Sequence, residues 1–139
     1  MSTRLKEKEE KILQALEWLA LESSRGTPLV VEGKNDTQAL KALAIEGRII
    51  EAKTGGRSLL DLTSKLEESG AEEVILLLDF DRRGREWTKR LKHSLEKMQI
   101  KPNIFFWKKL QAIVGREVKD VEGLRSYMET LKKKIIGHT

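Results

Sequence analysis

The sequence predicts a single α/β domain built on a mostly parallel four-stranded sheet with helices on both faces. Short apolar runs of strand length alternate along the chain with longer segments whose apolar residues recur at helical spacing. Strands that alternate with helices favour parallel pairing through right-handed crossovers. At 139 residues the chain can bury one core and is too short for a second of ordinary size, so we expect residues 1–139 to form one domain.

A change of apolar spacing marks the first helix and the first strand. Ile12, Leu16 and Leu19 recur at helical spacing and predict an amphipathic helix over residues 3–23. This helix fills the N-terminal region 1–24. The apolar run that follows predicts a strand over residues 29–32.

The next helix and strand are delimited by small and polar residues. Asn35 or Asp36 can cap a helix that Gly47 closes. Residues 48–52 then predict a short strand, and the loop 54–58 leads into a helix rich in leucine.

The most apolar run of the chain lies at residues 74–78 and predicts a strand in the centre of the sheet. A helix is expected over residues 85–98, and the aromatic segment 103–107 predicts the fourth strand. Two more helices are expected at the C-terminal end, in an extension over residues 108–139: 107–114 and 121–135.

Composition narrows the class of protein. Charged residues make up 35% and hydrophobic residues 39% of the chain, which is typical of a soluble globular domain. No apolar stretch reaches membrane-spanning length and the first residues lack the apolar core of a secretory signal, so we expect a cytoplasmic protein without a membrane partner. The absence of cysteine excludes disulfides and a thiolate metal site. The net charge of +5 favours a polyanionic partner such as RNA or DNA.

Two acidic clusters stand where apolar strands end. Glu32 closes the first strand, and Asp79-Phe80-Asp81 follows the central one. Because Asp79 and Asp81 are two residues apart, an extended chain places both carboxylates on the same side. Carboxylate oxygens suit a hard divalent cation such as Mg²⁺, with Mn²⁺ as an alternative. The same pattern also suits a pair of solvated loop aspartates or helix caps.

Glu32 strengthens the metal interpretation. An adjacent parallel strand would bring its carboxylate into the same crevice, where it can bind metal or exchange a proton. Three carboxylates without a counter-charge repel one another, so the site requires a metal or a basic partner. Basic residues flank the acids and can hold phosphate oxygens, or simply form an exposed face: Lys34, Arg82, Arg83 and Arg85.

Glycines and aromatic residues complete the candidate site. Gly33 and Gly84 let the backbone turn where each strand ends, and Gly55-Gly56 can bring backbone N–H groups to a phosphate or form a plain left-handed turn. We add Asn35 and Arg57 to the expected phosphate-binding set, and Asp36 borders the site. Aromatic side chains can stack on bases, but their spacing favours the core for most of them: Trp87, Phe105, Phe106 and Trp107.

These motifs resemble the Toprim domain of topoisomerases, bacterial-type primases, overcoming-lysogeny nucleases, recombination-mediator proteins and ribosomal-RNA-maturing nucleases. The resemblance covers about residues 28–107, and the whole chain looks like a small stand-alone archaeal Toprim protein. It implies a Rossmann-like four-stranded parallel sheet. It also implies that Glu32 is the general acid/base and that Asp79 and Asp81 hold Mg²⁺, with Glu32 as a further ligand, for phosphodiester cleavage or formation.

Departures from the family pattern narrow the activity. The Glu-Gly-Lys-x-Asp motif is most similar to the ribosomal-RNA-maturing nucleases, in which Lys34 and Asp36 would border the site. Arg83 stands where topoisomerases often carry a further acid, which argues against a complete two-metal site. Tyr127 lies in an apolar helical stripe, which argues against a topoisomerase nucleophile. No room remains for the zinc and template modules of a primase.

Three hypotheses therefore stand. The first is a Mg²⁺-dependent nucleic-acid phosphotransferase, most plausibly a nuclease for RNA or DNA. The second is a non-catalytic nucleic-acid-binding or adaptor module in a larger processing complex. The third is a subunit recruited by a protein partner through its first or last helix, although ordinary core packing is the simpler explanation of both helices.

Overall fold

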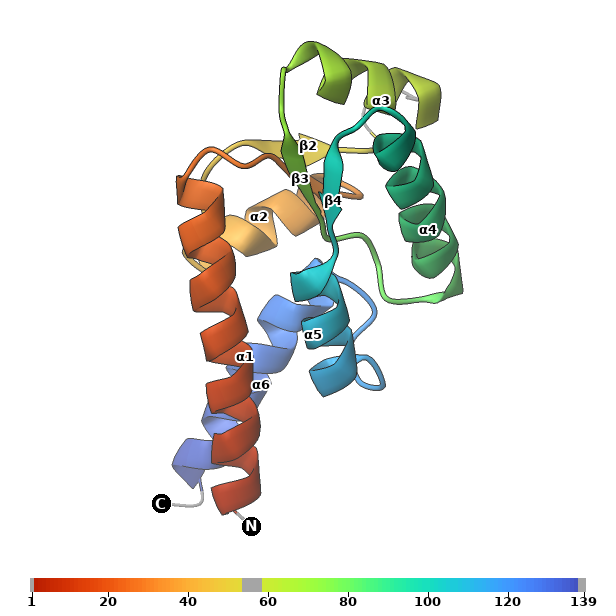
Figure 1. Ribbon diagram of the computed structural model, residues 1–139. Coiled ribbons are helices and arrows are strands. Elements are labelled where there is room, and N and C mark those ends of the chain that lie inside the picture. The colour runs from red at the N-terminus through yellow and green to blue at the C-terminus, as the bar shows by residue number, and fades with distance from the viewer. Residues whose placement is uncertain (1, 54–58, 138–139) are drawn as a thin grey trace.

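The structure is a computed structural model that describes residues 2–53 and 59–137, and its centre is a parallel β-sheet with helices around it (Figure 1). Within these residues the chain forms four strands and six helices: α1 (Ser2–Ser24), β1 (Leu29–Val31), α2 (Lys34–Ala42), β2 (Ile49–Glu51), α3 (Leu59–Glu68), β3 (Glu73–Leu76), α4 (Arg82–Lys97), β4 (Lys101–Asn103), α5 (Phe105–Val114) and α6 (Val121–Gly137).

The four strands pair in the order β2-β1-β3-β4, and every pair is parallel. Leu29 of β1 stands opposite Ile49 of β2 on one side and Ile75 of β3 on the other. β1 and β3 are therefore the two central strands, and their carboxyl ends are neighbours. This confirms the predicted α/β class and the central position of the most apolar run.

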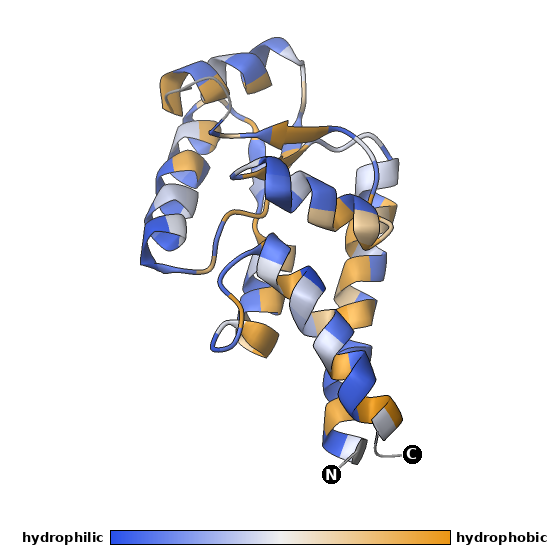
Figure 2. Ribbon diagram, turned by 180° about the vertical axis from the view of Figure 1, so that it is seen from behind, coloured by the Kyte–Doolittle hydropathy of each residue, from blue (hydrophilic) through white to orange (hydrophobic). Residues whose placement is uncertain are grey.

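Two cores cover the two faces of the sheet, because alternate residues of each strand point to opposite sides. Val31, Ile75 and Leu77 belong to the core that packs under α1, α2, α5 and α6. Val30 and Leu76 belong to the core under α3 and α4. Figure 2 shows hydrophobic colour on β2 and alternating hydrophobic and hydrophilic patches along the helices.

The first and last helices close the same core. α1 packs against α5 and α6, and α6 also packs against α2. Leu19 of α1 and Leu124 of α6 are fully buried there. The buried residues of both helices are thus packed within the chain, whereas Leu13, Trp18 and Leu21 of α1 are about half-exposed. None of the helices in the described ranges combines the length and the apolar character that a membrane crossing needs.

The fourth strand lies earlier than expected. The predicted strand 103–107 was wrong, because β4 covers Lys101–Asn103 and α5 already begins at Phe105. β4 is an edge strand, where Pro102 is tolerated because its missing N–H can face outward. The aromatic residues after it have strand propensity, but Phe106, Leu110 and Val114 are buried at helical spacing, and this packing decides the local structure.

Helix boundaries also differ from the prediction. α4 begins at Arg82 rather than Arg85, because the Asp81 side chain caps it by accepting from the Gly84 N–H at 2.7 Å. α2 begins at Lys34, so Gly33 rather than Asn35 or Asp36 is its N-cap residue. α2 also ends at Ala42, before the expected stop at Gly47.

Candidate metal and phosphate site

The acidic residues after β1 and β3 meet at the carboxyl ends of the two central strands, where parallel α/β sheets bind ligands. A pocket of about 260 Å³ opens there. Its lining combines acidic, basic and amide side chains: Glu32, Gly33, Lys34, Asn35, Asp36, Lys53, Asp79, Asp120 and Glu122.

Three carboxylates converge in this pocket. One oxygen from each of Asp36, Asp79 and Asp120 lies within 4.8 Å of the others. They come from three separate places, namely the first turn of α2, the segment after β3 and the residue before α6. Oxygen donors from three carboxylates are the ligand type that Mg²⁺ and Mn²⁺ prefer, so the donor set fits a hard divalent cation.

Asp36 also ties the pocket together. Its Oδ2 accepts from the Gly33 N–H at 3.2 Å, and its Oδ1 accepts from the Glu122 N–H at 3.2 Å. The side chain therefore joins the start of α2 to the start of α6. Burial raises the pKa of Asp36, although the two backbone N–H groups oppose the shift.

Asp79 has a strongly raised pKa. Its partial burial, a hydrogen bond with Glu32 and the negative charges of Glu32, Asp36 and Asp120 raise the pKa of Asp79 to about 8. Each of these causes disfavours the ionised form. A cation among the carboxylates would reverse the effect, because it stabilises ionised ligands.

Glu32 is held beside this group by a basic partner. Its side chain is buried, and its Oε2 lies 3.2 Å from the Lys53 Nζ. Lys53 follows β2, the strand next to β1, and its backbone N–H donates to the Glu32 carbonyl oxygen at 2.9 Å. The ion pair thus offsets part of the buried negative charge on the β2 side of the pocket.

Two close contacts fix the chain around Asp79. The Trp107 indole N–H donates to the carbonyl oxygen of Leu78 at 3.0 Å and lies 3.3 Å from that of Asp79. A Cβ at Gly84 would overlap the backbone carbonyl of Asp79. Gly84 is therefore needed for the close approach of α4 to the site, whereas Gly33 has an extended backbone and open space around it.

The second aspartate of the Asp-x-Asp motif has a different local role. Asp81 is exposed and caps α4, and it is not among the three carboxylates that converge in the described part of the chain. Its assignment as a metal ligand stays a prediction. The three arginines that follow, Arg82, Arg83 and Arg85, lie exposed in the first turns of α4.

The remaining predicted binders divide into two groups. Lys34 and Asn35 are exposed, open α2 and line the pocket. Gly55, Gly56 and Arg57 lie outside the described residues.

Sequence reasoning missed three residues of the pocket, namely Lys53, Asp120 and Glu122. Asp120 directly precedes the final helix, and its Oδ1 accepts from the Gly123 N–H at 2.6 Å. An aspartate at a helix start was the available signal. Lys53 was not predicted, although it follows β2, a third strand whose carboxyl end lies at the same edge of the sheet.

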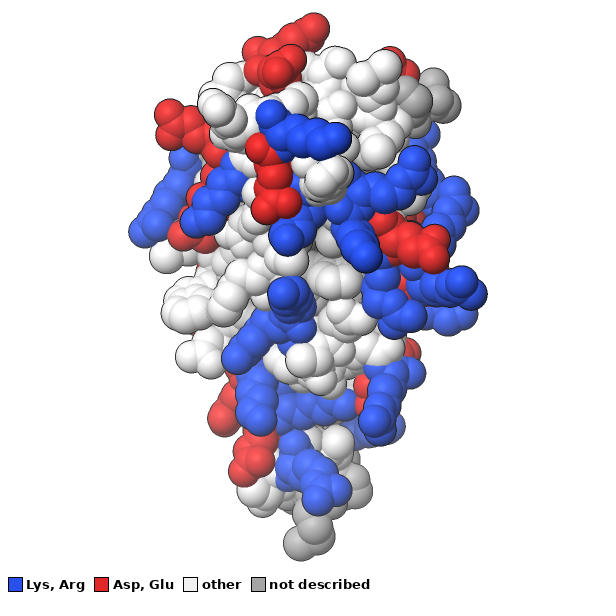
Figure 3. All heavy atoms as spheres, turned by 45° about the vertical axis from the view of Figure 1, so that its right-hand side comes forward, with Lys and Arg blue, Asp and Glu red and all other residues white. Residues whose placement is uncertain are grey.

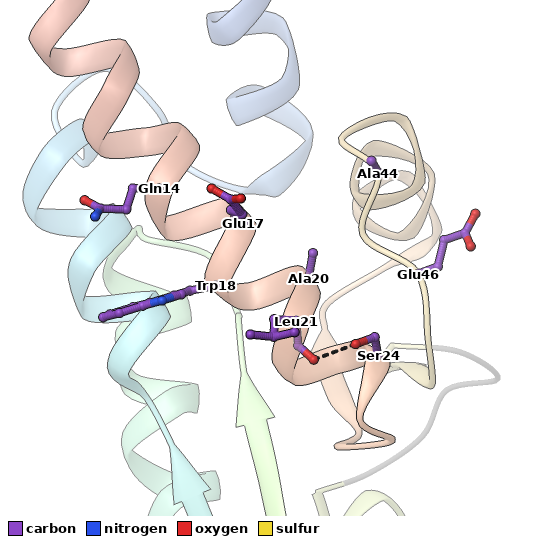
Figure 4. Close-up of a pocket in the computed structure, with 8 residues that line it drawn as sticks. All are labelled: Gln14, Glu17, Trp18, Ala20, Leu21, Ser24, Ala44 and Glu46. Carbon is purple, nitrogen blue, oxygen red and sulfur yellow. Dashed lines mark hydrogen bonds between the residues drawn. The ribbon is translucent and has the colours of Figure 1, made fainter.

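A roomier hollow of about 680 Å³ lies elsewhere, along the C-terminal half of α1 (Figure 4). Its lining includes Trp18, Leu21 and Glu46, and its Ser24 hydroxyl donates to the Leu21 carbonyl oxygen within the same helix at 2.7 Å. It holds neither converging carboxylates nor basic side chains. The smaller pocket is therefore the candidate site.

The aromatic residues serve the core for the most part. Phe106 and Trp107 are buried and Trp87 is half-buried, as the spacing predicted. Phe105 is the exception, because it is 48% exposed and packs against Trp18 with ring centroids 5.8 Å apart.

Comparison with known proteins now decides the family. The Toprim domain model matches residues 27–108, more than half of the chain. This chain belongs to the Toprim domain family. Among curated relatives, a UPF0292 protein of Methanosarcina barkeri is 38% identical over 125 residues, which cover 90% of this chain and 85% of the relative. A UPF0292 protein of Methanocaldococcus jannaschii is 36% identical over 120 residues, covering 86% and 91%.

A solved structure supports the same fold. A putative protein from Aquifex aeolicus superimposes with a TM-score of 0.64 at 28% sequence identity, over 78% of this chain and 94% of that one. Membership of the Toprim family indicates metal-dependent nucleic-acid processing and interaction with nucleic acid. Divalent metal binding agrees with the acidic group that this Toprim chain presents.

Proposed function

We propose that this Toprim protein is a Mg²⁺-dependent nuclease that cleaves phosphodiester bonds of RNA or DNA. The observation that carries the proposal is the convergence of Asp36, Asp79 and Asp120 beside buried Glu32, at the carboxyl ends of two adjacent parallel strands. These four neighbouring carboxylates are costly without a cation and suited to holding one.

The proposal assigns separate roles to the acids. Asp36, Asp79 and Asp120 would hold the cation, while Glu32 would exchange a proton with the attacking water or the leaving oxygen. Asp81 is the ligand that the family motif implies, and its side chain instead caps α4. A bound Mg²⁺ would supply Lewis-acid stabilisation of the charge that develops on the phosphodiester.

Basic residues beside the acids suit a phosphate substrate. Lys34 lines the pocket and is exposed, so its ammonium group can reach a phosphate oxygen. Lys53 already pairs with Glu32 at 3.2 Å and would orient that carboxylate. Lys53 is thus a positioning residue, and Lys34 is the direct phosphate contact.

The test is cleavage of labelled single-stranded, duplex and structured RNA and DNA with Mg²⁺ or Mn²⁺. Glu32→Gln removes the proton-exchanging group and Asp79→Asn removes a ligand charge, and each change is expected to lower the cleavage rate by at least about 100-fold. Glu68→Gln, at an exposed position at the end of α3, is the matched control and should cleave like the parent. Unchanged cleavage in both pocket variants would refute the proposed site.

One observation favours the second candidate, a non-catalytic nucleic-acid-binding module. Glu32 is engaged by Lys53 and is buried, so its proton exchange with a substrate requires the ion pair to open. A binding module would show salt-dependent association that survives Glu32→Gln and fails when Lys34, Arg82 and Arg85 are neutralised. Metal-dependent cleavage that Glu32→Gln abolishes would exclude this candidate.

A further inference from the structure

Helix α4 turns a strongly basic surface outward. Its buried stripe consists of Gly84, Thr88, Leu91 and Leu95. We call the exposed cations on its other sides the α4 basic face: Arg82, Arg83, Arg85, Lys89, Arg90 and Lys97. Figure 3 shows Lys and Arg side chains gathered on the side of the molecule where α4 lies.

Most of these cations lack a carboxylate partner among the described residues. Arg82 lies 3.4 Å from Glu86 through its Nε, in an exposed pair. In the ranges that the structure covers, no carboxylate lies within 4.0 Å of the charged groups of the other five cations: Arg83, Arg85, Lys89, Arg90 and Lys97. Intramolecular pairing therefore does not account for this concentration of charge.

The position of the arginines opposes helix stability. The first turn of α4 contains no acidic residue, and Arg82, Arg83 and Arg85 stand at or next to it. The N-terminal end of a helix already carries partial positive charge from its backbone dipoles. Cations placed there strengthen a positive potential that attracts phosphate.

The α4 basic face begins beside the acidic pocket. Asp81 caps α4, and Gly84 packs directly on the backbone of Asp79. Arg85 also lines a hollow of about 480 Å³ together with Arg116, which follows α5. A polyanion that follows α4 would therefore pass next to the proposed metal site.

The shape and composition of the face favour duplex over single-stranded nucleic acid. At about 1.5 Å per residue, the 16 residues of α4 extend roughly 24 Å, the length of about seven base-pair steps along the axis of a duplex. Proteins that hold single strands without sequence preference use exposed aromatic platforms. Trp87 is the aromatic residue of α4, and it is half-buried against the core.

We propose that the α4 basic face binds the phosphate backbone of double-stranded nucleic acid and holds it beside the acidic pocket. The inference rests on the proposed function, because it names the substrate class of the same site. Contacts with the phosphate backbone do not read the base sequence, and RNA and DNA duplexes both present such a backbone. The test therefore uses RNA duplexes and DNA duplexes separately.

The experiment measures binding of short labelled RNA and DNA duplexes, and of their single strands, without divalent metal over a series of salt concentrations. The test variant combines Lys89→Gln, Arg90→Gln and Lys97→Gln. The control variant has the same change of net charge and combines Lys11→Gln, Lys41→Gln and Arg48→Gln, which are exposed positions on or beside the elements of the opposite sheet face. Thermal unfolding checks that both variants fold.

Loss of three phosphate contacts should make the slope of log affinity against log salt shallower by about 2.7 and weaken duplex binding on the order of 100-fold at ~0.1 M salt. The control should bind at least one of the duplexes within about threefold of the parent. Equal effects of the two variants, no binding by the parent, or tighter binding of single strands than of both duplexes would overturn the inference. Because no metal is present, failure of cleavage alone leaves this result unchanged.

Discussion

The acidic pocket and the α4 basic face both concentrate charge of one sign, yet in opposite surroundings. In the pocket, Glu32 is 4% and Asp36 7% exposed, so their charges interact through a medium that screens them poorly. On α4, the Arg82 side chain is 87% exposed, and water and salt weaken its repulsion from neighbouring cations.

This difference in exposure determines where each region obtains its counter-charge. The pocket must offset its charge within the fold, through the Lys53 ion pair, backbone N–H donors and a protonated or metal-bound Asp79. The basic face can remain uncompensated until an external polyanion arrives, because exposed like charges cost little. The two regions meet at Gly84, which lets the start of α4 touch Asp79.

The largest effect on stability is expected from a substitution at Gly84, where α4 meets Asp79. Gly84→Ala places a methyl group against the Asp79 backbone carbonyl and should lower the free energy of unfolding by about 3 kcal/mol, with weaker Mg²⁺ binding. Gly33→Ala, which meets open space, should lower it by less than about 1 kcal/mol. Urea unfolding followed by circular dichroism compares the two variants. Equal stability of both would show that α4 does not need this close approach.

The stabilising effect of Mg²⁺ should depend on the acidic pocket and not on the α4 basic face. At about 100 times its dissociation constant, a cation bound only to the folded state stabilises it by about 2.7 kcal/mol. We expect Mg²⁺ to raise the melting temperature of the parent and not that of Asp79→Asn. Neutralising Lys89, on the basic face, should leave the effect intact.

The same melting experiment decides between two candidate ligands. Asp81 and Asp120 both cap helices through their side chains, so asparagine at either position keeps a cap. Asp120→Asn is expected to reduce the Mg²⁺ effect more than Asp81→Asn, because Asp120 belongs to the converging group. The opposite order would favour the Asp-x-Asp assignment made from sequence.

The pH dependence of stability should sharpen the contrast further. The pKa of Asp79 in the folded state, about 8, lies above its unfolded value of about 3.9, so the folded state holds the proton more tightly. Its contribution to the free energy of unfolding is therefore present at low pH and lost as pH rises from about 4 to about 8. Burial shifts the pKa of Asp36 in the same direction.

The measurement is urea unfolding in metal-free buffer across this pH range. Asp79→Asn should lose less stability than the parent as pH rises and should be the more stable protein at pH near 8. Parallel curves for the two proteins would mean that Asp79 ionises freely in the fold.

The sequence was sufficient where burial pattern alone determines structure. The apolar runs ending at Glu32 and Asp79 predicted adjacent parallel strands, and the strand order confirms them. Their carboxylates were correctly expected in one crevice, because parallel strands share one carboxyl edge.

The sequence was insufficient where tertiary contacts decide. Asp120 reaches the pocket because α6 packs on α2, which local periodicity cannot reveal. Asp81 was expected beside Asp79 on an extended chain, but regular pairing of β3 ends at Leu76 and the chain turns into α4. Phe105 likewise has strand propensity but begins a helix, because the residues that follow it are buried at helical spacing.

The smallest expected effect is the change in stability when a cation of the α4 basic face is replaced by an anion. Arg83→Glu replaces a cation in the first turn of α4 by an anion, which the helix dipole favours, so the free energy of unfolding should rise by about 0.3–1 kcal/mol. Arg90→Glu, in the middle of α4 and one turn after Glu86, should bring no such gain, because the dipole effect is confined to the end turns and a like charge is then nearby. Both changes should weaken duplex binding. If Arg83→Glu proved less stable than the parent, Arg83 would stabilise the folded protein. Its presence in α4 would then be explained without nucleic-acid binding.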